Sequence, residues 1–437
     1  MTALPHGWED LKIKDVARIG DGAHASIQRL DEGVLYLSSK NFGLERLNLS
    51  QVDYISQEDY EKHFRADSKA ITKPLENDVL LGIIGSLGAP YLVKKSDLFG
   101  LSSSVAIVRP NQSLIDPNYL YYWFKSPTFQ LAINQIKSGV AQSFLSLGMI
   151  GNLPCYFPKD LEHQKSIAAI LTSYEDLIEN NLKRIKLLEE MAQITYEEWF
   201  VRMKFPGHET TVFDKETGLP EGWEKRPISD FCEKITDGTH DSPKQVEQGV
   251  PLITGKHIEN GFINFDDAYL ISHEDHEKIK KRSGLSKWDI LFSNIGTLGN
   301  TGVVTQDFEY SCKNVVIFKR KPGFEYFLYS YLANEHTVNK LDSMSSGVAQ
   351  KFYSLKFIRA LEETLPGNDV IDKFNKFAEP ILTTKYKLHE QIKLLKEARD
   401  ILLPRLMTGM IDIEQVELPE AMLTRLEQQE DKMASAI

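Results

Sequence analysis

Two long stretches of the chain have the apolar spacing of helices. From residue 162 to about 200 there is no proline or glycine, and apolar side chains recur at intervals of four and three. A second stretch repeats this spacing from about 374 to 406, where Pro380 is expected to kink or delay the helix. Such spacing, sustained over several heptads, predicts a coiled-coil seam. The seam positions are Ile167, Leu171, Tyr174, Ile178, Ile185 and Leu188, followed in the second stretch by Ile381, Leu388, Ile392, Leu395 and Leu402.

The pattern elsewhere predicts two blocks of mixed strands and helices. Short β-branched and aromatic runs such as VLYLSS and VAIVRP alternate with Gly, Asn, Asp and Pro. An amphipathic segment follows in each block, and it predicts one or two helices. We therefore expect a first block at 1–158, a long helix at 159–205, a linker and second block at 206–368, a second long helix at 369–410 and a tail at 411–437. The tail is either a short helix or disordered.

The two blocks are copies of one unit. LPHGWEDLKIKDVARIGDGAH (4–24) returns as LPEGWEKRPISDFCEKITDGTH (219–240), and NDVLLGIIGSLG returns as WDILFSNIGTLG. SGVAQSFLSL (138–147) likewise returns as SGVAQKFYSL (346–355). Matches in the same order indicate a duplicated architecture. Almost nothing aligns between 25–54 and 240–270, which suggests two sites that perform the same task on different targets.

The duplication also predicts how the long helices pair. A helix of 38 residues is roughly 57 Å long and cannot bury its seam alone. We expect the two helices to form an antiparallel coiled coil, with Asn181 and Lys385 helping to set its register. The expected fold class is α+β, with two tandem mixed α/β domains at opposite ends of the helices and a pseudo-twofold axis. Two unrelated helices packed on separate domains are the alternative.

Composition narrows the class of protein. The net charge of −11 argues mildly against a nucleic-acid partner, because such proteins usually have a basic surface. No apolar run approaches the roughly 18 residues of a membrane span, and the N-terminus lacks a secretory pattern. The three cysteines stand far apart without a CxxC spacing, which suits a reducing compartment. These features predict a cytoplasmic protein without a disulfide framework.

Several motifs together resemble a known family. The duplicated blocks, the LPxGW openings, the IGTLG turn, the FYSL phrase and the long helix behind each block are similar to specificity subunits of type I restriction-modification enzymes. This resemblance runs from Leu4 to about Gly409. It implies that each block is a target recognition domain reading one half of a bipartite double-stranded DNA sequence. The paired helices would fix the spacer between the half-sites.

The resemblance also implies partners. The helices would dock two modification subunits, which bring S-adenosylmethionine and methylate adenine. Restriction subunits, which use ATP and Mg²⁺ for translocation and cleavage, would join that core. The chain itself would need no cofactor and no metal.

Polar side chains in the diverged loops and beside the repeated turns are the candidate DNA contacts. The loops DGAH and DGTH keep Asp, Gly and His, a pattern that turn chemistry explains more readily than DNA contact. LSSKNFG and ITGKHIENG each place a Lys beside Asn or His, side chains that can bond base edges. The glycine turns GIIGSLG and NIGTLGNTG lack a Walker lysine, so tight turns between strands are expected. The candidates are His24, Lys40, Asn41, Ser86, Ser103, Gln142, Thr239, His240, Lys244, Lys256, His257, Asn294, Thr297, Lys313, Asn314 and Gln350.

Other conspicuous residues favour structural roles. HEDH (273–276) contains metal-ligand residue types, but the first copy has no counterpart, so a solvated helix face is expected. A further set of apolar residues is expected in the core, namely Trp8, Phe144, Leu147, Trp223, Phe352 and Leu355.

The sequence lacks the motifs of the relevant enzymes. There is no NPPY or DPPY methylation motif, no GxGxxG after a strand, no Walker loop and no evident nuclease pattern. We therefore expect a DNA-reading protein without catalytic activity. Two other classes stay open, a protein-interaction scaffold built on a coiled coil without DNA reading and an enzyme with a site in each block.

Overall fold

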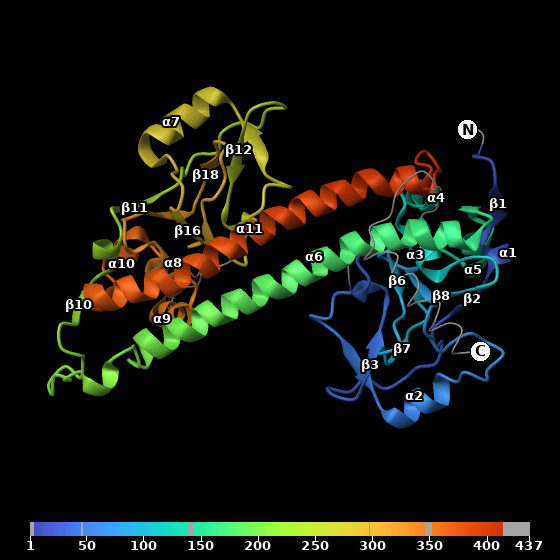
Figure 1. Cartoon of the computed structure of the whole chain (residues 1–437), viewed down its shortest axis with the longest axis horizontal. Coiled ribbons are helices and arrows are strands. Elements are labelled where there is room, and N and C mark those ends of the chain that lie inside the picture. Colours follow the sequence, from blue (N-terminus) through green and yellow to red (C-terminus); the bar gives the residue numbers. More distant parts are fainter. Residues whose placement is uncertain (1–3, 45–46, 139–143, 297, 346–351, 414–437) are drawn as a thin grey trace. The chain divides into compact units, whose positions relative to one another are not determined.

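The computed structural model describes residues 4–44, 47–138, 144–296, 298–345 and 352–413. The chain divides into two compact units, and each of them combines one predicted block with one half of each long helix. Unit 1 consists of Met1–Glu179 and Ile392–Ile437, and unit 2 consists of Asn180–Gln391. Figure 1 shows the elements with their labels.

Unit 1 is built on two small sheets and a separate strand pair. The four-stranded antiparallel sheet has the order β2-β8-β5-β6, with bounds Ala17–Asp21, Val105–Pro110, Val79–Gly82 and Pro90–Leu92. The three-stranded sheet has the order β4-β3-β7, with bounds Asp53–Ile55, Val34–Leu37 and Phe99–Leu101, and β3 pairs with β7 in parallel. Strands β1 (Trp8–Lys12) and β9 (Pro154–Pro158) form an antiparallel pair.

The helices of unit 1 begin at capping residues that the sequence supplies. Ser56 accepts a hydrogen bond from the N–H of Asp59, and Asp116 accepts one from Tyr119, so each closes an otherwise unpaired first turn. The helices are α1 (Ile13–Val16), α2 (Gln57–His63), α3 (Pro117–Lys125), α4 (Pro127–Ser138) and α5 (Leu147–Asn152).

Unit 2 repeats this topology strand for strand. Its four-stranded sheet is β11-β19-β16-β17 (Lys234–Asp237, Val316–Lys319, Ile290–Phe292, Thr301–Val303). Its three-stranded sheet is β15-β12-β18 (Tyr269–Ile271, Val250–Ile253, Ser311–Cys312), and β10 (Glu224–Pro227) pairs with β20 (Glu362–Leu365). The duplication is thus confirmed even for β3 and β12, which lie where the two sequences could not be aligned.

Unit 2 also has matching helices and one additional hairpin. The hairpin consists of β13 (Ile258–Glu259) and β14 (Phe262–Ile263). The helices are α7 (His273–Ser283), α8 (Glu325–Ala333), α9 (Glu335–Ser345) and α10 (Leu355–Arg359).

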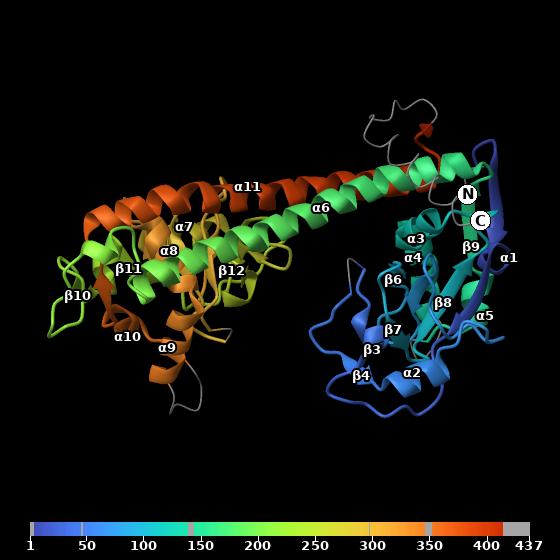
Figure 2. The ribbon, with the colours of Figure 1, turned by 60° about the horizontal axis from the view of Figure 1, so that its bottom comes forward.

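The two long helices pair in both units. They are α6 (Leu161–Tyr196), which ends in a π-helical turn, and α11 (Asn368–Met407), and they lie side by side in both views (Figure 1, Figure 2). In unit 2, Asn181 faces Gln391 at 3.5 Å, whereas Tyr196 stacks edge-on against Phe374. The pairing is therefore antiparallel, and the predicted coiled coil is confirmed. Most seam residues are buried, and Tyr174, Leu188, Leu395 and Leu402 are partly buried.

Pro380 does not delay the second helix, contrary to one of our two expectations, whereas the kink that we expected as the other outcome stays a prediction. Helix α11 is continuous from Asn368, although a proline inside a helix removes one backbone hydrogen bond. Phe374, Ala378 and Ile381 lie on both sides of Pro380 and are all buried in the core of unit 2. This burial compensates for the missing bond.

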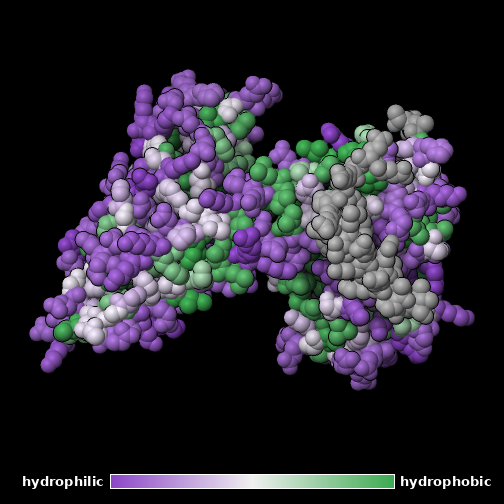
Figure 3. Space-filling view, viewed as in Figure 1, coloured by the Kyte–Doolittle hydropathy of each residue, from purple (hydrophilic) through white to green (hydrophobic). Residues whose placement is uncertain are grey.

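Each unit has its own hydrophobic core, and the long helices contribute to both. In unit 1, Ile167 and Leu171 of α6 share a core with Leu406 and Met407 of α11. In unit 2 the corresponding core includes Tyr196, Phe200 and Phe374, together with the predicted core residue Trp223. The side shown in Figure 3 is mostly hydrophilic, with smaller groups of hydrophobic residues. Among the described residues, none of the helices is long and apolar enough to cross a membrane.

Candidate nucleic-acid interface

The Asp-Gly-x-His loop has the same construction in both units. It follows β2 in unit 1 and β11 in unit 2. His24 Nε2 lies 2.8 Å from the carboxylate of Asp21, and His240 Nε2 lies 2.6 Å from that of Asp237. The His24 and His240 side chains are 73% and 59% exposed. Each loop therefore presents an imidazole whose orientation a carboxylate fixes.

The glycine of this loop is required by close backbone contact. A methyl group at Gly22 would lie 2.2 Å from the carbonyl oxygen of Leu101, and one at Gly238 would lie 2.2 Å from that of Cys312. The N–H of the following residue donates to the same carbonyl, from Ala23 at 2.8 Å in unit 1 and from Thr239 at 2.9 Å in unit 2. The loop is thereby attached to the end of β7 or β18. Turn chemistry and an exposed histidine are both present here.

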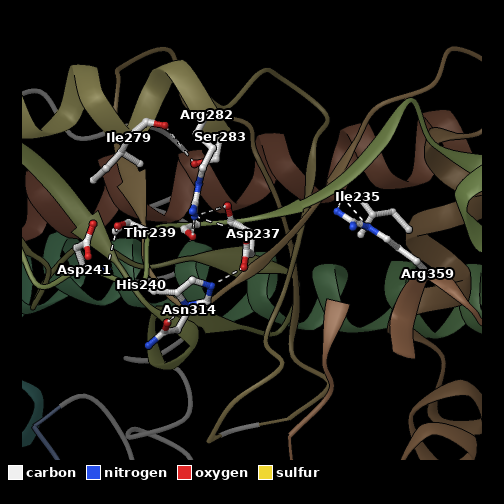
Figure 4. Close-up of polar contacts among 11 residues, drawn as sticks. Ile235, Asp237, Thr239, His240, Asp241, Ile279, Arg282, Ser283, Asn314 and Arg359 are labelled. Atoms are coloured by element: carbon white, nitrogen blue, oxygen red, sulfur yellow. Dashed lines mark hydrogen bonds and ion pairs between the residues drawn. The ribbon is translucent and has the colours of Figure 1, made fainter. Parts of the chain in front are cut away.

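In unit 2, further side chains complete this cluster (Figure 4). His240 Nδ1 lies 2.9 Å from Oδ1 of Asn314, and the Arg282 guanidinium donates to the carbonyl of Gly238. Lys313 donates to the hydroxyl of Ser242, and Thr239 is buried with its hydroxyl accepting from the N–H of Asp241. The structure thus brings four candidates together, Thr239, His240, Lys313 and Asn314. Arg282 was missed, because α7 reaches the loop only through the tertiary fold.

The matching position in unit 1 carries serines. The Ser102 and Ser104 hydroxyls lie 2.6 Å apart, and Ser104 Oγ accepts a hydrogen bond from the N–H of Ser39 at 3.0 Å. The candidate Ser103 lies between them and is partly exposed. Small hydroxyls in unit 1 thus replace the amide and ammonium groups of unit 2, so the two units present different chemistry on one framework.

A second loop of equivalent structure lies beside the first in each unit. It is a short 3-10 turn, Ser39–Asn41 in unit 1 and Gly255–His257 in unit 2. Lys40 and Lys256 are exposed on it and lie 3.6 Å from Asp53 and 2.5 Å from Asp267. A lysine is therefore presented at the same place in both units, next to an acid that it can exchange for a phosphate.

The residues that follow these lysines hold the loops together. Asn41 Oδ1 accepts from the N–H of Ser38 at 3.0 Å, and its amide donates to two backbone carbonyls. His257 Nδ1 accepts from the N–H of Thr254 at 2.8 Å. Asn41 and His257 are 1% and 3% exposed. Both side chains position the turn, and contact with bases by these two residues stays a prediction.

The remaining candidates are distributed around the glycine turns and the loops. Ser86 and Lys244 are exposed. Asn294 is buried, and its amide donates to the carbonyl of Tyr353 at 2.9 Å. Gln142, Thr297 and Gln350 lie outside the described residues. Asn294 thus ties the turn to the repeated FYSL phrase.

Two of our expectations about structural residues were wrong. Phe144 and Phe352 are 47% and 48% exposed, whereas the adjacent Leu145 and Tyr353 are fully buried. Successive side chains of an extended segment point in opposite directions, so burial of one exposes the other. The HEDH segment is also not simply a solvated face, because His276 is 3% exposed and its Nδ1 lies 2.9 Å from the hydroxyl of Ser311.

His276 belongs to the one group among the described residues that has metal-ligand geometry. Its ligand atoms and those of Glu277 and Glu309 lie within 4.8 Å of one another. The hydrogen bond from Lys280 to Glu309 lowers the pKa of that carboxyl and gives the acidic pair a resident cation. The group is therefore already charge-compensated.

The cysteines do not form a reactive centre. Burial raises the pKa of Cys155 well above its ordinary value, and it raises the pKa of Cys232 and Cys312 to about 12. A thiol is nucleophilic only as the thiolate, so these three groups stay inert at neutral pH.

Comparison with known proteins gives consistent matches over both copies. A family model described as "Type I restriction modification DNA specificity domain" matches residues 5–190 and 220–393. The chain is 22% identical to the type I restriction enzyme MjaIX specificity subunit of Methanocaldococcus jannaschii, over 94% of this chain and 95% of that protein. It is 23% identical to the HindI specificity subunit of Haemophilus influenzae, over 78% and 88% of the two chains.

A solved structure shares the fold. The S subunit of a type I restriction-modification system from M. genitalium aligns with a TM-score of 0.55 and 14% identity, over 93% of this chain and 97% of that one. At this identity the match supports the fold alone, namely two mixed α/β blocks and two long helices.

Proposed function

This chain belongs to the family of type I restriction-modification DNA specificity proteins, and we propose that it selects the DNA sequence on which a larger complex acts. Each unit reads one half of a bipartite duplex target. The observation that carries this proposal is the repetition of the framework strand for strand, with unlike side chains on the same loops. A scaffold without DNA reading would not need two sets of differing loops, and this alternative is not favoured.

We infer that the exposed lysines and histidines of both units contact DNA. Lys40, Lys256, His24 and His240 are exposed at matching places, and lysines commonly bind phosphate. Ser103 in unit 1 and Lys313 with Asn314 in unit 2 occupy the equivalent variable position, where bases would be distinguished. The net charge of −11 is compatible with this role if the partner subunits supply much of the phosphate contact.

The long helices carry a second duplicated feature, an exposed apolar stripe. On α6 in unit 2 it consists of Leu187, Met191 and Ile194, which are 63%, 43% and 61% exposed. On α11 in unit 1, Leu394 and Ile401 are 65% and 46% exposed. Leu394 and Ile401 each lie 207 residues after Leu187 and Ile194, so the stripes occupy equivalent positions of the two copies.

We assign one modification subunit to each stripe. Spacings of four and three place the three α6 side chains on one helix face, as a partner helix requires. Because the two stripes occupy equivalent positions of the two copies, they provide similar docking surfaces for two copies of one partner. In this proposal the partners supply S-adenosylmethionine for adenine methylation, and restriction subunits supply ATP-dependent cleavage. The chain itself reads DNA without catalysis in the cytoplasm, and its paired helices set the spacing between the half-sites.

Sequencing of methylated bases tests the reading function directly. Cells that contain this chain and its modification subunits should show a bipartite methylated motif, and cells without the chain should not. Lys313→Ala should alter only the half read by unit 2, because Lys313 belongs to that unit. Leu131→Ala, on an exposed face of α4, is the matched control. A motif that persists without the chain would refute the proposal.

Native mass spectrometry tests the docking assignment. Leu187→Asp combined with Ile194→Asp should remove one modification subunit from the complex, as should Leu394→Asp combined with Ile401→Asp. Leu182→Asp, at an exposed α6 position outside the stripe, should leave both subunits bound. Retention of two subunits by both double variants would place the docking surface elsewhere.

A further inference from the structure

Each unit presents an exposed phenylalanine beside its glycine turn. Phe144 is joined to Ile84 by a β-bridge in unit 1, and Phe352 is joined to Ile295 in unit 2. Phe144 and Ile84 are each 47% exposed, and Phe352 is 48% exposed. Ile295 is partly buried. The phenylalanines lie in the repeated phrases SFLSL and KFYSL, and the isoleucines occupy matching positions of the glycine turns GIIGSLG and NIGTLG.

The fold holds both phenylalanines outward. The N–H of Leu145 donates to the carbonyl of Ile83 at 3.0 Å, and that of Tyr353 donates to the carbonyl of Asn294 at 3.1 Å. Leu145 and Tyr353 are fully buried. Because they anchor the extended segment to the turn, the preceding phenylalanine must face solvent. A half-exposed ring adds little to the core, yet both copies keep it.

These apolar pairs adjoin the loops that we assign to DNA. In unit 1 the N–H of Ile83 donates to the carbonyl of Ser104, whose hydroxyl is bonded to Ser39, the residue before Lys40. In unit 2 a methyl group at Gly255, the residue before Lys256, would lie 3.5 Å from the carbonyl oxygen of Ile295. An exposed lysine therefore belongs to the loop next to each pair. This combination of a cation and an aromatic ring complements nucleic acid, whose phosphates are anionic and whose bases stack.

We propose that Phe144 with Ile84, and Phe352 with Ile295, are apolar wedges that enter the duplex at each half-site and unstack one base step. Phenylalanine and isoleucine side chains act in this way in proteins that bend DNA. Every base has a face on which a ring can stack, so the wedge carries little sequence information. This explains why the wedge is kept in both copies while the adjacent loops diverge. An opened step would also reduce the cost of taking a neighbouring base out of the stack.

The proposal rests on the proposed function, and it can be tested in the complex with the modification subunits. The probe is a duplex that carries the methylated motif with 2-aminopurine at successive positions of each half-site. With the unaltered chain, 2-aminopurine fluorescence should rise at one step in each half. Phe144→Ala or Phe352→Ala should abolish the rise in one half only and weaken binding about tenfold. Phe144→Trp and Phe352→Trp keep an aromatic ring at these positions, so each variant should show the fluorescence rise in both half-sites.

Controls separate the wedge from other roles of the same residues. Leu131→Ala removes an apolar side chain that is 61% exposed and should change neither signal. Binding that weakens by less than about twofold, with an unaltered fluorescence rise, would overturn the proposal. Loss of a modification subunit from Phe144→Ala or Phe352→Ala would also overturn it and identify a protein-docking surface. If the proposed function itself fails, the unaltered chain will not distinguish the motif from other DNA.

Discussion

The paired helices are held by different buried charges in the two units. In unit 1, Glu175 of α6 lies 2.9 Å from Arg399 of α11 and 2.8 Å from Lys125 of α3. In unit 2, Glu189 of α6 pairs with Lys385 of α11, and Tyr329 of α8 bonds to both. The carboxylate is on α6 and the cation on α11 in each case. Similar tasks are therefore performed by unlike residue sets.

The two clusters differ in how many buried cations share each α6 carboxylate. The Arg399 and Lys125 side chains are 5% and 7% exposed and share the carboxylate of Glu175. Arg399 also lies 2.9 Å from the exposed carboxylate of Asp400, and the Lys125 ammonium lies 5.4 Å from the centre of the Tyr121 ring. Lys385 is 1% exposed, and its ammonium lies over the rings of Phe262 and Tyr329 at 4.8 Å and 5.2 Å. Buried charges are costly unless they are paired, and aromatic faces offset part of that cost. Aromatic rings contact a cation in both units, but Glu175 serves two buried cations and Glu189 serves one, so loss of the carboxylate should cost unit 1 more.

Glu175→Leu should have the largest effect on stability. It leaves two buried cations close to each other, and removal of one partner from a buried ion pair costs about 3–5 kcal/mol. Hydrogen exchange should show faster opening in residues 161–179 and 392–407 than in the helix segments of unit 2. Glu190→Leu, which removes an exposed partner of Lys186, serves as the control. Equal protection of both units would contradict the comparison.

The Glu189→Leu substitution should lower the free energy of unfolding by a smaller amount, about 2 kcal/mol, because Tyr329 and the aromatic rings still contact Lys385.

Burial lowers the pKa of Lys385, and Glu189 opposes that shift. The folded-state pKa therefore lies below the unfolded value of about 10.4, and the unfolded chain binds more protons between these two values. Burial of the charged Lys385 side chain destabilises the folded state to its full extent below the folded-state pKa. This destabilisation disappears as the pH rises towards the unfolded-state pKa.

The pH dependence distinguishes the two clusters. Without Glu189 the pKa of Lys385 falls further, so the Glu189→Leu variant should recover stability as the pH rises from 7 towards 10. In unit 1, Lys125 can lose its proton in this range but Arg399 cannot, so Glu175→Leu should recover only part of its larger loss. Urea unfolding at several pH values, followed in each unit by hydrogen exchange, measures this difference. Parallel pH profiles for the two variants would show that the clusters are equivalent.

Local sequence patterns predicted much of the fold. The seam and the main strands follow from apolar spacing, which acts over a few residues, and the duplicated blocks follow from internal repetition. The Asp-Gly-x-His loops were recognised because both copies retain them. Continuity of α11 through Pro380 was not predicted, because it depends on core residues contributed by other elements.

The candidate site was predicted less completely, because side-chain direction depends on the tertiary fold. Asn41 and His257 differ in residue type, yet both cap the same turn from a buried position. Phe144 is apolar but faces solvent, because Leu145 takes the buried position. Arg282 reaches the loop of unit 2 from 45 residues away, and no local signal marks it.

Substitution of the loop glycines should reduce stability by a smaller amount, and this loss should be equal in both units. Gly22→Ala and Gly238→Ala each place a methyl group against a backbone carbonyl, and such overpacking costs about 1.5 kcal/mol. Both variants should lower the melting temperature to a similar extent and weaken DNA binding. Gly7 has a positive φ, which Gly22 and Gly238 lack, and no atom lies within 4 Å of a methyl group there, so Gly7→Ala measures backbone strain alone. Unequal losses at Gly22 and Gly238 would show that the two loops differ in construction.

The smallest expected effect concerns Asn314, which distinguishes the histidine of unit 2 from that of unit 1. Its φ of 52° lies in the left-handed region, so Asn314→Gly keeps the backbone and removes only the amide that bonds to His240. Loss of one hydrogen bond predicts roughly threefold weaker binding, and only for changes in the half-site that unit 2 reads. Ser104→Gly is the equivalent substitution in unit 1, where His24 is paired with the carboxylate of Asp21 at 2.8 Å. If Asn314→Gly weakens binding equally at both half-sites, the amide does not contribute to reading by unit 2. Because stability should be nearly unchanged, a loss confined to one half-site would show that the Asn314 amide contributes to reading by unit 2.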